Sequence, residues 1–355
     1  RYWTLKGYRY AGIFRQNGNR INWKYRVAVD NKVKEYKDKN KTPGISLAVA
    51  KGGKIVYRRG FGYSDVKRKR VAHSETVYYT ASVGKSIGAT LAMRMTDKLG
   101  LDKKGTLVLD IKKPTSDFIP TMPSHHTHTV AQLLSHRACV RNKPFNPEPN
   151  KQYNSALSAA PTFWDKTLLT PCTIGDGSTS KYSNSAFTLL GAVLEAKGKK
   201  SISQLLQFYL AKPLGLGSLR AEYPLTYNYD RSERYVGKKN KKWVQNSSWK
   251  VLAGGMEIHA VDLARFGIKL KKGQVMKKET RDDMWTKPTK PWKNYGLGWF
   301  IWTNYVYHNG AFEGARSLIR IYKKKDLVIA ILSNHKNNDG MGIISLADKI
   351  VKIVK

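Results

Sequence analysis

A serine and a lysine three residues apart form the first chemical candidate in the sequence. Ser82 opens the segment Ser-Val-Gly-Lys that ends at Lys85, and apolar residues at helical spacing predict a helix over residues 82–99. The first turn of a helix has free backbone N–H groups, and residues three apart share one face. A neutral Lys85 amine could therefore take the hydroxyl proton of Ser82 and make its oxygen nucleophilic. Alone, this spacing also fits a helix cap followed by a surface lysine.

A tyrosine and an asparagine two residues apart form the second candidate. Tyr182 and Asn184 come just before a predicted helix over residues 186–196. A tyrosine at such a junction could relay a proton to a leaving group, and the asparagine amide could hold a substrate carbonyl. In isolation, a helix cap beside a half-buried tyrosine is the simpler interpretation.

Small residues after a histidine near the C-terminus form the third candidate. The segment His-Asn-Gly-Ala begins at His308 and includes Gly310 and Ala311. A polar residue followed by small ones on an edge strand lets a substrate lie against the backbone. The N–H of Ala311 could then pair with the N–H of Ser82 as an oxyanion hole. A glycine-rich turn with a surface histidine is the alternative interpretation.

Strand signals at both ends of the chain must position these candidates. Two β-prone runs at residues 44–50 and 55–57 flank a Gly-Gly pair, which predicts a hairpin. Strands from both ends suggest one shared sheet, with a helical domain inserted in the middle. The further predicted strands are 295–302, 305–308, 316–322 and 327–333, and the further predicted helices are 130–134, 202–210, 257–270 and 343–354.

The composition is that of a chain with a packed core. Hydrophobic residues make up 41% and aromatic residues 11% of the 355 positions, which excludes wholesale disorder. No run of 18 apolar residues occurs, so the sequence predicts no transmembrane segment. The chain begins at Arg1 without a methionine, and we expect any leader or tag to have been removed.

The charge is strongly positive and spread along the whole chain. Lys and Arg number 64 against 25 Asp and Glu, a formal net charge of +39. Short basic runs such as 67–70 and 323–325 fall between apolar segments. Such a coat attracts any polyanion without choosing a sequence. A solvated surface, an acidic partner (nucleic acid, acidic glycan or anionic lipid) and engineered supercharging remain three open interpretations.

Two cysteines and one histidine cluster bear on metals and compartment. Cys139 and Cys172 lack a nearby histidine pair, so they do not form a zinc site. One disulfide closing a loop of about thirty residues would contribute on the order of 3 kcal/mol, although two free thiols are also possible. With two glycosylation sequons, at residues 40–42 and 246–248, this favours a secreted protein. The histidines at 125, 126 and 128 lack acidic or thiol companions, and we expect a solvated loop there.

The order and spacing of the three candidates resemble those of the serine β-lactamase and penicillin-binding-protein superfamily. It includes class C β-lactamases, D-alanyl-D-alanine carboxypeptidases, family VIII esterases and the mitochondrial β-lactamase-like protein. The family shows Ser-x-x-Lys, then Tyr-x-Asn about a hundred residues on, then Lys/His-x-Gly near the C-terminus. The resemblance covers roughly residues 40–355 and includes the segments 133–136 and 253–256.

The resemblance implies an α+β fold of the β-lactamase/transpeptidase type, with an antiparallel sheet flanked by helices and an inserted all-α domain. Residues 40–110 and 246–355 would form the α/β domain, and residues 111–245 the mainly helical domain. Residues 1–39 are an N-terminal extension that the resemblance does not explain. The family works without a metal or organic cofactor, so none is expected.

The implied activity is that of a serine hydrolase acting on a small-molecule ester or amide. Ser82 would be acylated and then released by hydrolysis, while Lys85 and Tyr182 handle protons. The residues implied in substrate binding are Asn184, His308, Gly310, Ala311 and Arg316. A cationic binding or structural protein with an idle site is the alternative, although four intact motif residues argue against it. The oligomeric state is open, because relatives include monomers and filaments.

Three residues depart from the family pattern. His308 stands where class C β-lactamases carry lysine, and a neutral imidazole binds a carboxylate more weakly than an ammonium group. Esters or small amides are therefore favoured over penicillins. Arg316 could replace the lost charge, because we expect it to share strand parity with His308. Cys139 stands where relatives usually have glycine, and its bond to Cys172 would be a local staple on the helical domain.

Overall fold

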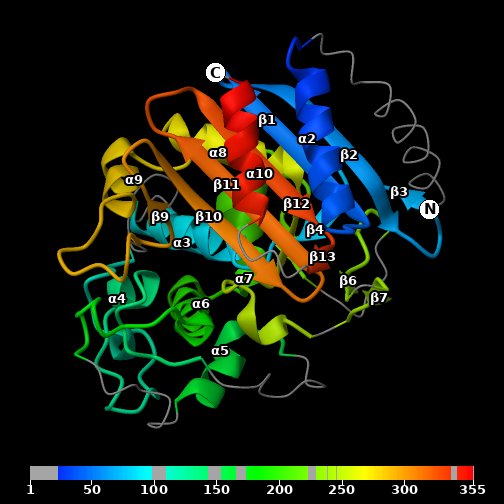
Figure 1. Cartoon of the computed structure of the whole chain (residues 1–355). Helices are drawn as coiled ribbons and strands as arrows, with labels where there is room; N and C mark the ends of the chain where they lie inside the picture. The colour runs from blue at the N-terminus through cyan, green and yellow to red at the C-terminus, as the bar shows by residue number, and fades with distance from the viewer. Residues whose placement is uncertain are drawn as a thin grey trace.

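The centre of the computed structural model is a seven-stranded antiparallel sheet that both ends of the chain build together (Figure 1). The structure describes residues 23–97, 109–142, 153–164, 173–222, 229–237, 239–244, 246–336 and 342–354. The strand order is β3-β2-β1-β12-β11-β10-β9. The bounds of these strands are Gly44–Lys51 for β1, Lys54–Asp65 for β2, Arg70–Val71 for β3, Phe300–Ile301 for β9, Tyr305–Phe312 for β10, Ala315–Tyr322 for β11 and Leu327–Ser333 for β12.

The predicted hairpin near the N-terminus is confirmed. Gly52 and Gly53 join β1 to β2 with φ values of +63° and +68°, a left-handed conformation that glycine adopts without strain. On its other side β1 pairs with β12 over seven residues, from Ile45 opposite Ser333 to Lys51 opposite Leu327. The first and last strands of the chain therefore lie side by side in the middle of the sheet.

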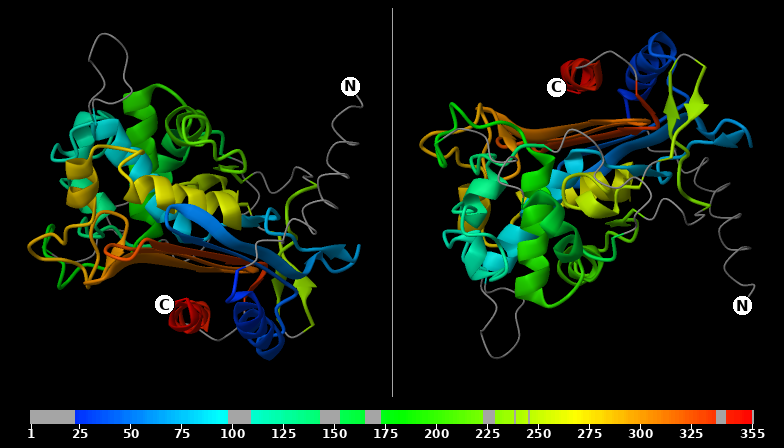
Figure 2. Two further views of the ribbon diagram at one scale, coloured as in Figure 1. Left: turned by 90° about the horizontal axis from the view of Figure 1, so that it is seen from above. Right: turned by 90° about the horizontal axis from the view of Figure 1, so that it is seen from below.

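Helices cover both faces of this sheet (Figure 2). Helices α2 (Arg26–Lys39) and α10 (Gly342–Ile353) lie on one face, packed over apolar residues such as Ile329. Helices α3 (Val83–Thr96) and α8 (Ala260–Lys271) lie on the other face, packed over residues such as Ile319. Alternation of side chains along each strand supplies both cores. Helix α2 lies within the predicted extension 1–39, so this part of the extension packs against the sheet.

The middle of the chain forms a mainly helical region on the α3 side of the sheet (Figure 2). Its elements are η1 (Thr115–Asp117), α4 (Val130–Leu134), α5 (Ala156–Ala159), η2 (Ala160–Phe163), α6 (Asn184–Gly198), α7 (Ile202–Leu206) and η4 (Gln207–Ala211). The remaining helices are η5 (Ser248–Lys250) and α9 (Lys278–Met284). Helix α6 is buried along most of its length, because it runs between its helical neighbours and α3. It therefore carries its N-terminus to the sheet domain.

Two small sheets tie the end of the middle segment to the sheet domain. Strand β8 (Met256–His259) pairs with both β4 (Val77–Tyr79) and β5 (Arg220–Ala221). Strand β6 (Tyr235–Val236) pairs with both β7 (Lys241–Lys242) and β13 (His335–Lys336). Strand β5, within the predicted helical domain 111–245, therefore pairs with a strand of the predicted α/β domain 246–355.

The histidine cluster is packed inside the helical region, so the prediction of a solvated loop there is wrong. His126 and His128 are buried, at 1% and 0% exposure. His126 Nδ1 lies 3.1 Å from His128 Nε2, and His128 Nδ1 lies 2.9 Å from the Thr115 hydroxyl. Burial lowers the pKa of His128 to about 3, so its ring is neutral. Among the described residues, no group of three or more metal-ligating side chains is arranged to hold an ion.

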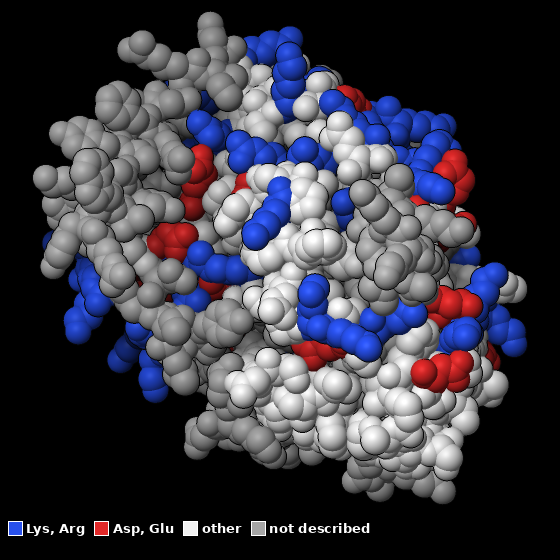
Figure 3. Space-filling model, turned by 180° about the vertical axis from the view of Figure 1, so that it is seen from behind, with Lys and Arg blue, Asp and Glu red and all other residues white. Residues whose placement is uncertain are grey.

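Basic side chains lie over many elements of the surface. On the face seen in Figure 3 they form several separate groups, with acidic and uncharged side chains between them. This distribution fits a coat better than the single stripe of a sequence-reading protein. In the part of the chain that the structure describes, no helix is long and apolar enough to cross a membrane.

We predict that the sheet core, rather than its edge, determines the stability of the fold. Replacing fully buried Ile329 in the central strand β12 by alanine should lower the free energy of unfolding by about 2–5 kcal/mol. The matched change Val71→Ala, at 41% exposure in edge strand β3, should change it by less than about 0.5 kcal/mol. Urea denaturation of both variants measures the difference, and equal losses would contradict this description of the core.

Candidate active site

Ser82 stands at a sharp turn between strand β4 and helix α3. It is the N-cap residue of α3 and partly exposed. The preceding Ala81 has φ +44°, an uncommon conformation for a residue with a side chain. A Cβ atom on Gly254 would lie only 2.6 Å from the Ala81 carbonyl oxygen, so a glycine is needed where the 247–255 segment touches this turn. The turn presents the Ser82 hydroxyl beside the free N–H groups of the helix start.

The amine of Lys85 lies beside that hydroxyl in a fully buried position. Its Nζ is 3.3 Å from Ser82 Oγ, 2.6 Å from Asn184 Oδ1 and 2.6 Å from the Ala253 carbonyl oxygen. Burial holds the pKa of Lys85 well below its usual range, and the nearby positive charge of Lys250 lowers it further. The surroundings therefore favour the neutral amine.

The contacts of Lys85 also give this neutral amine a direction. An uncharged –NH₂ group has two N–H donors and one lone pair. The carbonyl oxygens of Asn184 and Ala253 can only accept, so they take both N–H bonds. The lone pair is left for the third neighbour, the Ser82 hydroxyl, which can donate its proton to it. The arrangement is that of a base and its nucleophile.

Tyr182 closes the site from the helical region. Its ring lies over the Lys85 amine, with 4.7 Å between Nζ and the ring centroid. Its hydroxyl is buried and makes no hydrogen bond with the described residues. Burial raises the pKa of Tyr182, and the Ser82 side chain lowers it, so the phenol is neutral and its hydroxyl neighbours that of Ser82. A neutral phenol here can give or relay a proton.

Asn142 holds the Tyr182–Asn184 segment in place, and no sequence motif pointed to this residue. Its amide nitrogen donates to the Tyr182 carbonyl over 3.0 Å, and its amide oxygen accepts from the Asn184 backbone N–H. Ser183, between them, caps helix α6 by accepting from the Ala186 N–H. The cap explains why a helix begins here, and the two bonds from Asn142 hold the backbone on both sides of Ser183.

Strand β10 lies directly against the start of helix α3. A Cβ atom on Gly310 would lie 2.8 Å from the Ser82 backbone nitrogen and 2.7 Å from the Thr80 carbonyl oxygen, so only glycine fits. The next residue, Ala311, is exposed. Strand β9 pairs with β10 only at Val306 and Tyr307. Among the described residues, β9 therefore leaves the outer edge of β10 uncovered beside Ser82, where a substrate could lie along it.

His308 lies at this site with both ring nitrogens already bound. Its Nε2 is 3.0 Å from the Tyr295 hydroxyl, and its Nδ1 is 2.7 Å from the Asn309 carbonyl oxygen. The carbonyl requires a proton on Nδ1, so Nε2 accepts from Tyr295. Burial lowers the pKa of His308 to about 3, and a protonated Lys85 would act in the same direction. The expected contact with a substrate carboxylate would have to break one of these bonds, so the geometry favours a supporting role.

His136 supports Tyr182 from beneath. The two ring centroids lie 4.3 Å apart, and Tyr295 lies 4.7 Å from His136 on another side. The His136 Nδ1 accepts from the Ser183 backbone N–H over 3.2 Å. Burial lowers the pKa of His136 well below its usual value, so it stays neutral. His136 belongs to the family-like segment 133–136. Its left-handed backbone conformation, with φ +58°, could not be predicted from the sequence.

Arg316 lies on the wrong face of the sheet to serve this site. The register of β10 and β11 places Arg316 opposite Ala311 and His308 opposite Ile319. Residues paired across an antiparallel ladder share a face, and faces alternate along a strand. Arg316 therefore shares the face of Ala311, not that of His308. The expected parity between Arg316 and His308 is wrong because the hairpin between the strands reverses it.

Cys139 takes part in a disulfide bond. Its predicted partner Cys172 lies outside the described residues, so the pairing stays a prediction. Cys139 has φ +58°, the left-handed region that favours glycine. This conformation explains why glycine would be the usual residue at this position.

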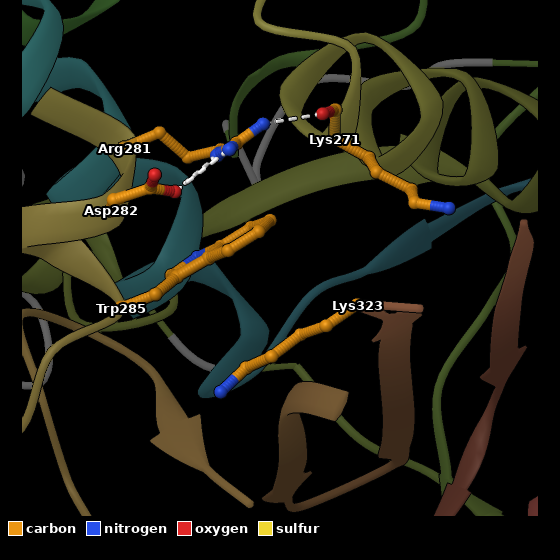
Figure 4. Close-up of a pocket in the computed structure, with 5 residues that line it drawn as sticks. All are labelled: Lys271, Arg281, Asp282, Trp285 and Lys323. Atoms are coloured by element: carbon orange, nitrogen blue, oxygen red, sulfur yellow. Dashed lines mark hydrogen bonds and ion pairs between the residues drawn. The ribbon is translucent and has the colours of Figure 1, made fainter. Parts of the chain in front are cut away.

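A pocket of about 350 Å³ lies away from this site, beside helices α8 and α9 (Figure 4). Asp282 and Arg281 lie on one side of the Trp285 ring and Lys323 on the other. Arg281 is already bound to Asp282, and Lys271 to Asp326. None of the predicted site residues lines this pocket.

Comparisons with known proteins identify the family of the chain. A family model described as Beta-lactamase matches residues 29–347. PbpX of Bacillus subtilis (strain 168), named as a penicillin-binding protein, is 22% identical over 84% of this chain and 72% of its own length. The chain spans only 62% of the length of Protein flp from Staphylococcus aureus (strain MW2), which is also 22% identical over 86% of this chain.

Solved structures share the fold. The octameric penicillin-binding protein homologue from Pyrococcus abyssi superposes with a TM-score of 0.75 at 22% identity, over 91% of this chain and 77% of that one. D-amino acid amidase from Ochrobactrum anthropi SV3, complexed with L-phenylalanine amide, gives a TM-score of 0.75 at 18% identity, over 92% of this chain and 98% of that one. The predicted β-lactamase/transpeptidase-like fold is confirmed.

We predict that Gly310→Ala forces β10 away from the start of α3. The added methyl group would meet backbone atoms of Thr80 and Ser82, which cannot rotate away as the Ser317 side chain can. The free energy of unfolding should fall by about 1–3 kcal/mol in urea denaturation. Gly217→Ala is the matched control, because a Cβ there meets nothing within 4 Å. A Gly310→Ala variant as stable as this control would contradict the close approach.

Proposed function

Because the chain belongs to the β-lactamase family, we propose that it is a serine hydrolase that works through an acyl-enzyme on a small ester or amide. The observation that carries the proposal is the placement of Lys85 Nζ, 3.3 Å from Ser82 Oγ and bound to two acceptor oxygens. A buried lysine with this set of partners is suited to remove a hydroxyl proton.

The first half of the reaction forms the acyl-enzyme. Ser82 Oγ bonds to the substrate carbonyl carbon while its proton passes to Lys85 Nζ. The carbonyl oxygen becomes an oxyanion, for which the N–H groups of Ser82 and Ala311 are the candidate donors. The bond to the leaving alkoxide or amine then breaks, and the proton leaves with it through the Tyr182 hydroxyl. Asn184 holds Lys85 and is also within reach of an acyl amide.

The second half of the reaction releases the acid. Water attacks the Ser82 ester carbonyl and gives its proton to the same pair of groups, Lys85 and Tyr182. The Ser82–acyl bond breaks, and the hydroxyl regains a proton. Protons and charge balance over the cycle, so no metal or further reactant is needed.

The absence of charge at His308 supports esters and small amides over penicillins. A substrate carboxylate at that end of the site would meet a neutral ring whose two nitrogens are occupied. A carboxylate binds more weakly there than beside a free ammonium group. We therefore propose that the leaving group of the natural substrate carries no carboxylate.

Binding of polyanions is a second candidate function, favoured by the net charge of +39 alone. It would act through the surface rather than through Ser82, and it would weaken steeply as salt rises. Retention on heparin near physiological salt, without hydrolysis of any ester, would favour it over the hydrolase.

We predict that Ser82→Ala abolishes hydrolysis of p-nitrophenyl butyrate. The value of kcat/KM should fall at least about a thousandfold, because the variant has no nucleophile. Mass mapping after fluorophosphonate treatment should find the adduct on Ser82 in the unchanged protein and none in the variant. Ser203→Ala, at a partly exposed position of α7, is the control and should keep full turnover. Unchanged turnover in Ser82→Ala would end the proposal.

We predict that activity is lost as pH falls through the pKa of Lys85. Below this pKa the amine is protonated and cannot act as a base, whereas above it the amine is free. Because burial depresses this pKa, the loss should occur well below pH 10, the range of an ordinary lysine. His308 stays neutral until about pH 3 and cannot cause it. An acid limb of the kcat/KM profile with its midpoint near pH 10, as for an ordinary lysine, would contradict the depressed pKa.

A further inference from the structure

Strand β10 orders the parts of the site along one line. Gly310 lies against Ser82 at the middle of this line. His308 lies toward one end, with its ring centroid 6.5 Å from that of Tyr182. Phe312 lies toward the other end and packs against Tyr79 and Ala81. If Tyr182 gives its proton to the leaving group, the leaving group lies at the His308 end, and the acyl group extends toward Phe312.

A buried lysine, Lys250, lies at the Phe312 end of this line. Lys250 is only 6% exposed, and its Nζ lies 3.4 Å from the centroid of the Phe312 ring and 5.3 Å from that of Trp249. Its backbone carbonyl accepts hydrogen bonds from Ala253, Gly254 and Gly255, in the loop that also supplies an oxygen to the catalytic amine. The tight loop therefore fixes Lys250 relative to Ser82.

The charge of Lys250 has no partner of its own among the described residues. Glu222 is its nearest source of negative charge, but that carboxylate is paired with Arg234 over 3.1 Å. The charge of Arg234 acts on Lys250 with the opposite sign, and the rings of Phe312 and Trp249 lie beside the Lys250 amine. Burial lowers the pKa of Lys250 to about 7. An incoming carboxylate would restore its charge and pair with it.

We propose that Lys250 and the face of Phe312 form a subsite for an acyl group that ends in a carboxylate. This inference rests on the proposed function and names its substrate class, an ester or amide of a short dicarboxylic acid. The methylene groups of the acyl chain would pack on the Phe312 ring, and the terminal carboxylate would meet the Lys250 ammonium.

The length of the acyl chain follows from the strand. Successive residues of a strand are about 3.3 Å apart, and in the proposed complex the reacting carbonyl would lie beside the Ala311 N–H. The Phe312 ring is therefore one to two residues away, on the order of 5 Å. A succinyl or glutaryl chain spans this distance, whereas an acetyl group does not reach it.

Two esters with the same leaving group test the proposal. The unchanged protein should hydrolyse mono-p-nitrophenyl glutarate at least about tenfold faster, in kcat/KM, than p-nitrophenyl butyrate. In Lys250→Gln this ratio should fall to about one, whereas Lys250→Arg should retain a preference. Lys324→Gln is the matched control, because it removes one positive charge from an exposed position in the turn between β11 and β12.

A third ester separates the subsite from general attraction to the basic coat. In 3-carboxy-4-nitrophenyl butyrate the carboxylate belongs to the leaving group. Attraction to the coat would speed both anionic esters, and Lys250→Gln would leave their ratio unchanged. The subsite predicts that Lys250→Gln slows the glutarate ester alone, relative to the other two.

A second readout follows from the charge that Lys250 exerts on Lys85. Removing that charge in Lys250→Gln should raise the pKa of Lys85, so the acid limb of the kcat/KM profile should move to higher pH. Thermal unfolding checks that each variant is folded. If Lys250→Gln does not fold, the ester ratio in the unchanged protein and in Lys250→Arg decides.

The outcomes separate this inference from the proposed function. A glutarate-to-butyrate ratio near one in the unchanged protein overturns the subsite and leaves the hydrolase intact. An equal ratio in Lys250→Gln and Lys324→Gln does the same. Failure of the unchanged protein to hydrolyse any of the three esters overturns the proposed function and the subsite with it.

Discussion

The site depends on one costly arrangement, a lysine amine enclosed by protein. A buried ammonium group loses its hydration, so the structure favours the uncharged form of Lys85. Two carbonyl oxygens, from Asn184 and Ala253, then determine which way the remaining lone pair points. One oxygen comes from the helical region and the other from the sheet domain. The orientation of the Lys85 amine therefore depends on both the helical region and the sheet domain.

The need to bring these segments together also explains two glycines and a strained turn near Ser82. Gly254 and Gly310 each let a neighbouring segment approach the Ala81–Ser82 turn more closely than a side chain would permit. Ala81 accepts a left-handed conformation so that Ser82 can begin helix α3. Such local strain persists only where surrounding contacts hold it, and here three segments converge on one turn.

Local patterns predicted much of the fold, and the order of motifs predicted much of the site. The Gly-Gly hairpin, helix α3 and the C-terminal strands follow from periodicity and turn residues, which depend on near neighbours. Face assignments were harder, because the turn before Arg316 reverses parity. The bound state of His308 depends on Tyr295, which only the fold brings near. Lys250 was hidden among 64 Lys and Arg residues, since a sequence does not separate a buried lysine from a solvated one.

The central pairing of β1 with β12 has a consequence for how the chain folds during translation. Strands β1 and β2 are synthesised long before their partner exists, because β12 comes after nearly all of the other described elements in the chain. Until then the edge of β1 that β12 will cover stays unpaired, while α2, which is made earlier, can already pack on one face of the hairpin. Dense positive charge would keep such nascent chains apart from one another. The sheet can therefore be completed only after β12 has been synthesised.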